Sequence, residues 1–194
     1  PVPTGAELAR AGTLDSLEVL YWVGCAAAFD ERNRKVARAV ATCLWAAGVR
    51  FAVLGQEEAC TGDPARRMGN EYVFQILASG NIETLKRYGM QKRTIITACP
   101  HCFNTIGAEY GQLGGTFEIV HHSVYLRGLL AAGRLQLATD GHAPKRSVTL
   151  HDSCYLARYN GILAEPREVL RQVPAVELRE MVTSPGGTTI AAIR

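Results

Sequence analysis

Short apolar runs alternate with longer amphipathic stretches along most of this chain. The short runs are rich in β-branched residues and are typical of buried strands. We expect such strands at residues 19–23, 49–54, 94–97, 117–120, 147–150 and 176–178. Between them, apolar residues recur at intervals of three and four, which predicts helices. These helices are expected at residues 30–47, 63–79, 82–88, 101–110, 123–132 and 166–172.

This order of elements predicts an α/β fold, in which a parallel sheet carries helices on both faces. Residues 139–145 include a glycine and a proline and make the best linker. We therefore expect one nearly complete unit followed by the start of a second, pseudo-equivalent unit. In both units a strand leads to a lone cysteine, Cys25 or Cys154, which indicates a weak internal repeat. The predicted parts are an N-terminal extension (1–17), the first unit (18–138), the start of the second (146–181) and a tail (182–194).

Composition and charge exclude several classes of protein. The formal net charge is only +3 and the basic residues are scattered, so a nucleic-acid partner is not expected. No apolar run approaches the roughly 20 residues of a membrane span, and the first residues do not resemble a signal peptide. The six cysteines are too few and too unevenly placed for a disulfide scaffold. We expect a piece of a longer cytoplasmic protein, with any membrane association through a missing domain or subunit.

The most informative stretch is Cys99-Pro-His-Cys102, which lies between a predicted strand and a predicted helix. Two thiols at this spacing either carry out thiol–disulfide exchange or hold a metal. Two further cysteines, Cys25 and Cys60, lie in loop-like segments beside glycines, where the backbone can approach a ligand closely. The choice between a redox dithiol and a metal site depends on whether these four thiols meet.

The predicted topology brings all four thiols to one edge of the sheet. Sites in open α/β sheets form outside the carboxyl ends of the strands. Three of the four cysteines directly follow a strand, and Cys60 follows one after a short loop. Helices that begin beside Cys60 and Cys99 direct free N–H groups toward the same edge, which favours thiolate. Four thiolates suit an iron–sulfur cluster and also suit zinc.

The remaining cysteines and histidines are weaker candidates. Cys43 lies in the apolar stripe of a helix, so we expect it to pack in the core. His101 lies between two thiols and is expected to tune them rather than to bind metal. One of His121 and His122 is expected to cap a helix or to pack in the core. Cys154 ends a strand as a ligand would, but no thiol follows it.

Four sequence motifs together resemble the cysteine-rich (CCG) domain family. This family includes heterodisulfide reductase subunits B and D, the iron–sulfur subunits of glycolate oxidase and anaerobic glycerol-3-phosphate dehydrogenase, and the lactate-utilisation iron–sulfur protein. Its pattern is a lone Cys, then Cys-Cys-Gly, then Cys-x-x-Cys, usually present twice. The resemblance implies one [4Fe–4S] cluster for each complete pattern, in some members of non-cubane form. The motifs here are residues 21–25, 57–71, 97–105 and 151–158.

The resemblance assigns Cys25, Cys60, Cys99 and Cys102 to the first cluster and makes Cys154 the lone cysteine of a second copy. This chain departs from the family pattern in two ways. It has Ala59-Cys60-Thr61-Gly62 in place of Cys-Cys-Gly, so a four-cysteine cubane is more natural than a five-thiolate cluster. The second copy also stops early, because its next thiol would fall near Thr189.

The implied function is that of an iron–sulfur electron-transfer module in a larger, heterodisulfide reductase-like oxidoreductase. A flavoprotein or ferredoxin-type domain would donate electrons, and a disulfide or quinone would accept them through other subunits or domains. The chain is not expected to turn over a substrate alone. We expect Arg66, Arg67 and Arg158 to offset the negative charge of the cluster. The alternatives are a structural zinc module for subunit assembly and a Cys-Pro-His-Cys thiol–disulfide oxidoreductase.

Overall fold

The computed structural model describes residues 2–137 and 146–179, so the predicted linker at 139–145 and the tail at 182–194 lie outside the described residues. The chain divides into two compact units, Pro1–Leu135 and Gln136–Arg194. Within the described ranges, no helix is both long enough and apolar enough to cross a membrane.

The first unit is built on a four-stranded sheet with the strand order β2-β1-β3-β4. Every neighbouring pair is parallel, which confirms the predicted fold class. From β1 the chain first adds a strand on one side and then returns to add strands on the other. The order therefore reverses at β1, and ligands of such sheets bind at the carboxyl ends near this point. The strands are β1 (Val19–Trp22), β2 (Phe51–Ala52), β3 (Thr94–Thr97) and β4 (Glu118–His121).

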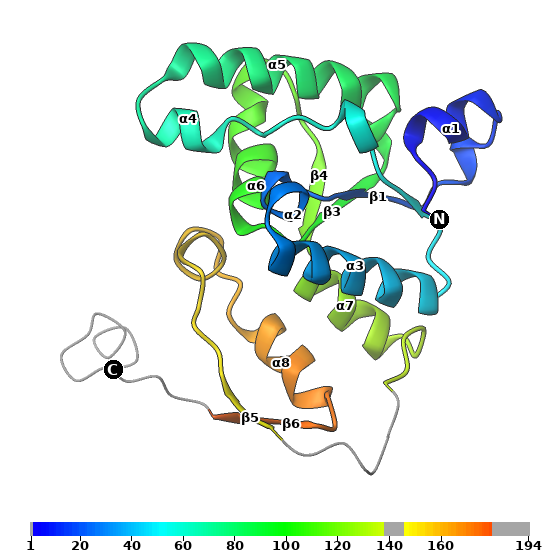
Figure 1. Cartoon of the computed structure of the whole chain (residues 1–194), viewed down its shortest axis with the longest axis vertical. Coiled ribbons are helices and arrows are strands. Elements are labelled where there is room, and N and C mark those ends of the chain that lie inside the picture. Colours follow the sequence, from blue (N-terminus) through cyan, green and yellow to red (C-terminus); the bar gives the residue numbers. More distant parts are fainter. Residues whose placement is uncertain (1, 138–145, 180–194) are drawn as a thin grey trace. The chain divides into compact units, whose positions relative to one another are not determined.

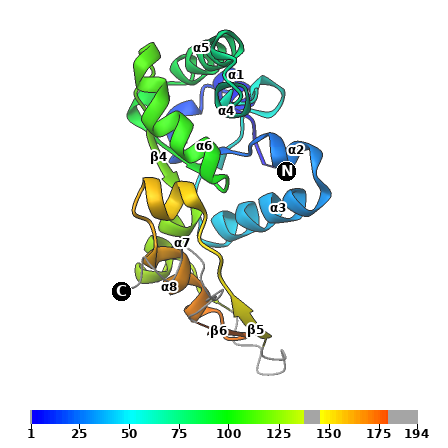
Figure 2. The ribbon, with the colours of Figure 1, turned by 90° about the vertical axis from the view of Figure 1, so that its left-hand side faces the viewer.

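Helices cover both faces of this sheet. Helices α3 (Glu31–Ala46) and α7 (His122–Ala131) lie on one side, and α5 (Glu71–Arg87) lies on the other (Figures 1 and 2). The main core forms between α5 and the sheet, where Phe74 packs in one cluster with Trp22. The shorter helices are α1 (Gly5–Arg10), α2 (Cys25–Phe29), α4 (Asp63–Arg67) and α6 (Pro100–Asn104). Single 3₁₀ turns occupy Leu14–Ser16, Gly55–Glu57, Met90–Lys92 and Tyr110–Leu113.

The N-terminal segment contains a helix that the sequence interpretation did not include. Thr4 and Glu7 form a capping box at the start of α1, in which the Glu7 N–H donates to Thr4 Oγ1 at 3.2 Å and the Thr4 N–H donates to Glu7 Oε2 at 2.7 Å. The Gly5 N–H donates to the Val53 carbonyl at 2.9 Å, beside β2. Leu8 also packs against the core, so this segment is attached to the first unit. The Thr-x-x-Glu spacing was the available sequence signal.

The helices after Cys60 differ from the prediction in their ends. Gly62, not Asp63, is the N-cap, and α4 ends after a few residues at a turn in which Gly69 has a φ of +83°. A new helix then begins, with Asn70 Oδ1 accepting from the Val73 N–H at 3.1 Å. This helix, α5, runs on to Arg87 and absorbs the separate helix predicted at residues 82–88.

The helix that begins at Pro100 and contains Cys102 is not a regular α-helix throughout. It widens from α6 into a π-helical turn at Thr105–Glu109. Gly107 in this turn lies against β4, since a Cβ there would come 2.9 Å from Ile119 Cγ2. The lack of a side chain at Gly107 therefore lets the widened turn approach the sheet.

The second unit is smaller. Strands β5 (Arg146–Thr149) and β6 (Val176–Arg179) pair in parallel, with Arg146 aligned with Val176. Helix α8 (Ala164–Gln172) lies between them in sequence, and a π-helical segment occupies Tyr155–Tyr159. These elements agree with the strands and the helix predicted from the sequence.

Gly62 is a glycine at which both the backbone conformation and the available space oppose a side chain. Its φ is +87°, and an added Cβ would lie 2.9 Å from Phe74 Cδ2 and 3.2 Å from Phe74 Cα. Gly48 has a φ of +66° but no atom within 4 Å of an added Cβ. We expect Gly48→Ala to cost about 1–2 kcal/mol of unfolding free energy from backbone strain. Gly62→Ala should cost roughly 1–3 kcal/mol more from overpacking, measured by urea unfolding. Equal losses of unfolding free energy in Gly62→Ala and Gly48→Ala would contradict this account of Gly62.

Candidate functional site

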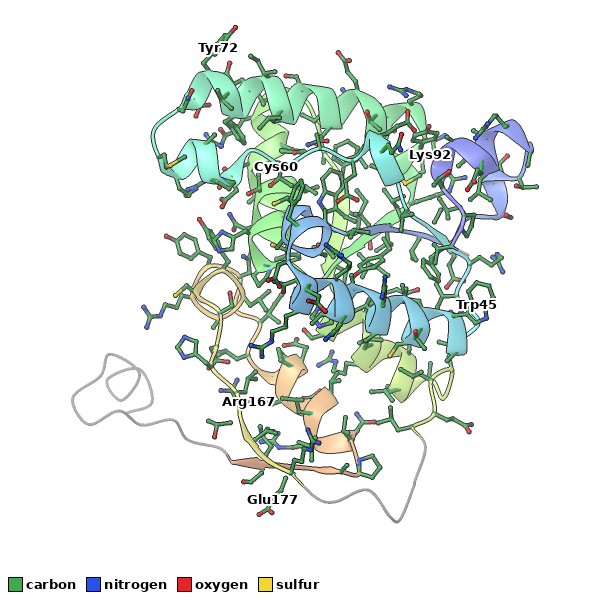
Figure 3. All side chains as sticks on the ribbon, viewed as in Figure 1. Trp45, Cys60, Tyr72, Lys92, Arg167 and Glu177 are labelled. Carbon is green, nitrogen blue, oxygen red and sulfur yellow. The ribbon has the colours of Figure 1, made fainter. Side chains whose placement is uncertain are left out.

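The predicted ligand cysteines all lie in segments that leave the carboxyl ends of strands. Cys25 begins α2 shortly after β1, and Cys99 is the N-cap of α6 shortly after β3. Cys102 lies within α6 and is buried. Cys60 lies in the loop that leads from β2 to α4, and Figure 3 shows it between α4 and α2. All six cysteines of the chain are free thiols.

The four thiols form one interacting group. Burial and the neighbouring Cys60 thiol, which hydrogen-bonds to Cys25, raise the pKa of Cys25. The pKa of Cys99 is lowered to about 6, first because the Cys102 thiol donates to it and also because nearby backbone N–H groups do so. The same hydrogen bond and burial raise the pKa of Cys102, with a further contribution from the charge of Cys25. Cys25, Cys99 and Cys102 thus each lie close enough to another thiol of the set for it to affect their pKa.

Gly24 allows the first strand to turn close to Cys99 and Cys102. Its φ is +83°, in the region that favours glycine. A Cβ at this position would lie 3.5 Å from Cys102 Sγ and 3.8 Å from Cys99 Cβ. The backbone before Cys25 therefore packs directly against the Cys99–Cys102 pair.

Two buried side chains hold the loop that carries Cys60. Asn81 on α5 donates from Nδ2 to the Cys60 carbonyl at 2.9 Å, and its Oδ1 accepts from the Ala59 N–H at 3.3 Å. The Tyr110 hydroxyl donates to the Thr61 carbonyl at 3.1 Å. Asn81 also donates to this hydroxyl, at 3.1 Å, which links the two anchors. The loop is thus tied to the core on both sides of Cys60.

Glu58 joins this loop to the turn before Cys25. Its Oε2 accepts from the Val23 N–H at 3.0 Å, and its Oε1 accepts from the Gly24 N–H at 2.5 Å. Burial raises the pKa of Glu58 to about 7, although these two N–H groups act in the opposite direction. The sequence interpretation did not single out Glu58, because a lone glutamate in a loop gives no signal that it bonds to a distant turn.

Asp63 holds the helix that carries the Cys99–Cys102 pair. Its buried carboxylate contacts His101 Nδ1 at 2.8 Å and accepts from the Thr105 hydroxyl at 3.3 Å. The Cys99 N–H donates to Thr97 Oγ1 at 3.2 Å. The neighbouring His101 side chain is one of the smaller causes that lower the pKa of Cys99. The His101 ring is held by Asp63, and its expected tuning of the thiols stays a prediction.

The expectation that Arg66 and Arg67 offset the charge of a cluster needs correction. Arg66 Nη1 lies 2.8 Å from Glu109 Oε2, and Arg67 also pairs with Glu109. Arg67 Nε lies a further 3.2 Å from Asp63 Oδ1. Carboxylates already compensate both arginines, so the pairs join α4 to the helix after Cys102. Arg158 lies in the second unit, and its predicted role stays a prediction.

His121 caps α7, as predicted for one of the two neighbouring histidines. Its Nδ1 accepts from the Ser123 N–H at 3.4 Å, which leaves Nε2–H to donate to the Ala98 carbonyl at 3.2 Å. This contact fixes the peptide group just before Cys99. His122 Nδ1 lies 3.2 Å from His121 Nε2. Burial lowers the pKa of His121 to about 3, helped by His122, and lowers that of His122 to about 4.

The other two cysteines are placed differently. Cys43 lies on α3, and only burial raises its pKa, with no contribution from another thiol. Cys154 belongs to the second unit, where it follows β5 and immediately precedes the π-helical segment. Close to it, Asp152 forms a two-pronged ion pair with Arg167 of α8, at 2.6 and 2.8 Å. Cys154 thus follows a strand and precedes a helical segment, as Cys25 does.

Four cysteine thiols could hold either a zinc ion or an iron–sulfur cluster. A zinc site needs four sulfurs at about 2.3 Å from one point. No group of three or more His, Cys, Asp or Glu side chains in the described ranges is arranged to hold one metal ion. An iron–sulfur cluster places several irons between its ligands, so its cysteine sulfurs stand farther apart. Cys99 and Cys102 lie against Gly24, and Cys60 follows two residues after Glu58, which bonds to the same turn.

The fold and site define a parallel α/β protein with a cluster of thiols at the carboxyl edge of its sheet. The sequence profile of the family described as "CCG: Cysteine-rich domain" matches residues 19–107 and 148–188. The chain therefore belongs to the cysteine-rich (CCG) domain family. No solved structure gives a significant match.

Several curated proteins are similar to this chain. One is the EtfAB:quinone oxidoreductase of Syntrophomonas wolfei, 44% identical over 79% of this chain and 21% of that protein. Another is the probable iron-sulfur-binding oxidoreductase FadF of Bacillus subtilis, 40% identical over 94% of this chain and 25% of that protein. The D subunit of the dihydromethanophenazine:CoB–CoM heterodisulfide reductase of Methanosarcina mazei is 34% identical over 86% of this chain and 41% of that protein. The chain thus spans between about a fifth and two fifths of these relatives.

The histidine pair predicts a pH dependence of stability. Unfolded histidine has a pKa near 6.5, so below about pH 6.5 the unfolded state binds more protons than the folded state. Each histidine should therefore remove stability as the pH falls toward 4, by up to about 1.4 kcal/mol per pH unit. His121→Asn retains a capping oxygen, and we expect it to weaken this fall between pH 6.5 and 5. Urea unfolding of the metal-free proteins measures how the free energy of unfolding depends on pH. The same pH dependence in His121→Asn as in wild type would contradict the prediction.

Proposed function

We propose that this chain is an iron–sulfur electron-transfer module of a larger oxidoreductase. One [4Fe–4S] cluster would be held by Cys25, Cys60, Cys99 and Cys102. The observation that carries the proposal is the geometry around Gly24: this residue, just before Cys25, lies against Cys99 and Cys102, and it is bonded to Glu58, two residues before Cys60. The relatives of this chain, which include a probable iron-sulfur-binding oxidoreductase and a heterodisulfide reductase subunit, support it.

A bound cluster supplies one-electron chemistry, and this chain supplies its environment. The four thiols bind as thiolates, which must lose their protons when metal enters. The lowered pKa of Cys99 makes it the thiol most readily available as a thiolate at neutral pH. Backbone N–H groups at the starts of α2 and α6 can donate to sulfur, and burial around Cys102 limits access of water. Hydrogen bonds to sulfur and burial set the potential of such a centre.

The proposed partners are the other domains or subunits of the oxidoreductase. A flavoprotein or a ferredoxin-type domain would donate the electron, and a quinone or a disulfide would accept it. The names of the relatives include both a quinone and a heterodisulfide, which favours this pair of acceptor classes. The module has no substrate reaction of its own in this proposal. Reduced thiol ligands suit a reducing compartment, so we propose the cytoplasm.

Ligand variants give the direct prediction. Anaerobically reconstituted wild-type protein should be brown and should carry about four irons and four acid-labile sulfides per chain. Replacing Cys25, Cys60, Cys99 or Cys102 by Ala should each remove most of the iron and the visible absorption. Cys43→Ala and Cys154→Ala are the matched controls, and both should keep the wild-type content.

Other results would point elsewhere. A colourless protein that holds one zinc per chain would replace the cluster by a structural zinc site. About eight irons per chain would show a second cluster and contradict the single-cluster proposal. Reduction of insulin disulfides by iron-free protein, lost on replacing Cys99, would establish the thiol–disulfide oxidoreductase instead.

A further inference from the structure

Glu58 connects two segments that carry cysteines but lie far apart in sequence. It lies two residues before Cys60, and both carboxylate oxygens bond to the turn just before Cys25. The bonds run from Gly24 N–H to Oε1 at 2.5 Å and from Val23 N–H to Oε2 at 3.0 Å. Each carboxylate oxygen accepts from one backbone N–H, so the side chain is held at both of its oxygens. This pair of hydrogen bonds is a stiff link between the two segments.

The segment on the Glu58 side is itself anchored. Asn81 binds the backbone at Ala59 and Cys60, and Tyr110 binds the Thr61 carbonyl. Both anchoring side chains are buried in the core. A continuous set of hydrogen bonds therefore runs from the core, through the Cys60 loop and Glu58, to the turn that leads into Cys25.

The segment on the Cys25 side needs such a link. The turn passes through Gly24 at a φ of +83°, in contact range of the Cys102 sulfur. Cys25 itself is exposed and starts a helix of only a few residues, so little packing fixes its position. Its thiol nonetheless lies close enough to that of Cys60 for Cys60 to contribute to its raised pKa.

We propose that Glu58 is a positioning residue that sets the relative placement of the Cys25 and Cys60 thiols before any cluster is loaded. It touches neither thiol and acts through the backbone of Val23 and Gly24. The effect of Glu58 on cluster retention rests on the proposed function. Its effect on the placement of the thiols in the metal-free protein is independent of that function.

Glu57 provides a matched control in the same loop. It is also a glutamate and directly precedes Glu58, but its carboxylate binds different partners. Its Oε1 lies 2.7 Å from Arg87 Nη1, and its Oε2 accepts from the Tyr88 hydroxyl. Glutamine at this position keeps oxygen and nitrogen atoms in reach of both partners. Glu57→Gln therefore removes a carboxylate from the loop and leaves the turn before Cys25 untouched.

The experiment compares Glu58→Gln with Glu57→Gln in the whole chain. At position 58, glutamine replaces one accepting oxygen by an NH₂ group that must face an N–H. In metal-free protein treated with diamide, peptide mapping measures the rate at which a Cys25–Cys60 disulfide forms. We expect Glu58→Gln to slow this rate about 10-fold, since the loss of one hydrogen bond to the turn is worth about that factor. Glu57→Gln should match wild type, with circular dichroism showing all proteins folded at the assay temperature.

The loaded proteins give the second readout. Removing an outer partner of a ligand typically weakens metal binding about 10- to 100-fold, so iron release to a chelator should accelerate by that order in Glu58→Gln. The electron paramagnetic resonance signal of its reduced cluster should also shift from the wild-type signal, which a loss of global stability alone would not cause. Glu57→Gln should again match wild type.

The outcomes separate the two proposals. Equal rates of Cys25–Cys60 disulfide formation in Glu58→Gln and Glu57→Gln would overturn the positioning role of Glu58. Slow disulfide formation in Glu58→Gln, together with a wild-type chain that takes up no iron, would uphold the positioning role of Glu58. It would overturn the proposal of an iron–sulfur cluster. If Glu58→Gln does not fold, Glu58→Asp serves in its place, because it keeps the charge but is too short to reach both N–H groups. A folded Glu58→Asp variant that forms the Cys25–Cys60 disulfide at the wild-type rate would likewise overturn the positioning role.

Discussion

The parallel pairing of β1 with β3 is the constraint on which the thiol site depends. Its register aligns Trp22 with Thr97, so that the two strands end side by side. The turn at Gly24 and the N-cap at Cys99 follow from these neighbouring ends. A slip of one residue would exchange the faces of a whole strand, and would remove Trp22 from the core that it shares with Phe74. Burial of the core thereby fixes where the thiols emerge.

The electrostatics of the site favour a bound positive centre. Burial and the neighbouring thiols hold the pKa of Cys25 and of Cys102 above the usual range, while Cys99 alone is lowered. Four thiolates cannot share such a site without a cation, because like charges within a few ångströms oppose one another's ionisation. The two arginines nearest in sequence to Cys60 are paired with Glu109 and do not supply that charge. A metal centre would supply it and release the remaining protons.

The sequence predicted what depends on local pattern and on general topology. The third strand agrees with its predicted range, and the strand-end placement of Cys25, Cys99 and Cys102 followed from apolar runs that stop before them. The structure added what depends on side chains that reach across the fold. Glu58 carried no signal, because its partners are backbone N–H groups more than thirty residues away. The π-helical turn after Cys102, in which Gly107 packs closely against Ile119 of β4, likewise carried no signal in the sequence.

The most direct test of the central claim is X-ray absorption at the iron edge of the anaerobically isolated chain. The account predicts that each iron has a first shell of sulfur alone and a second shell of neighbouring irons, as in a [4Fe–4S] centre held by cysteines. Substitution of Cys60 should remove this signal, and substitution of Cys43 should leave it unchanged. A chain that contains only zinc, or iron with no neighbouring iron, would contradict the account.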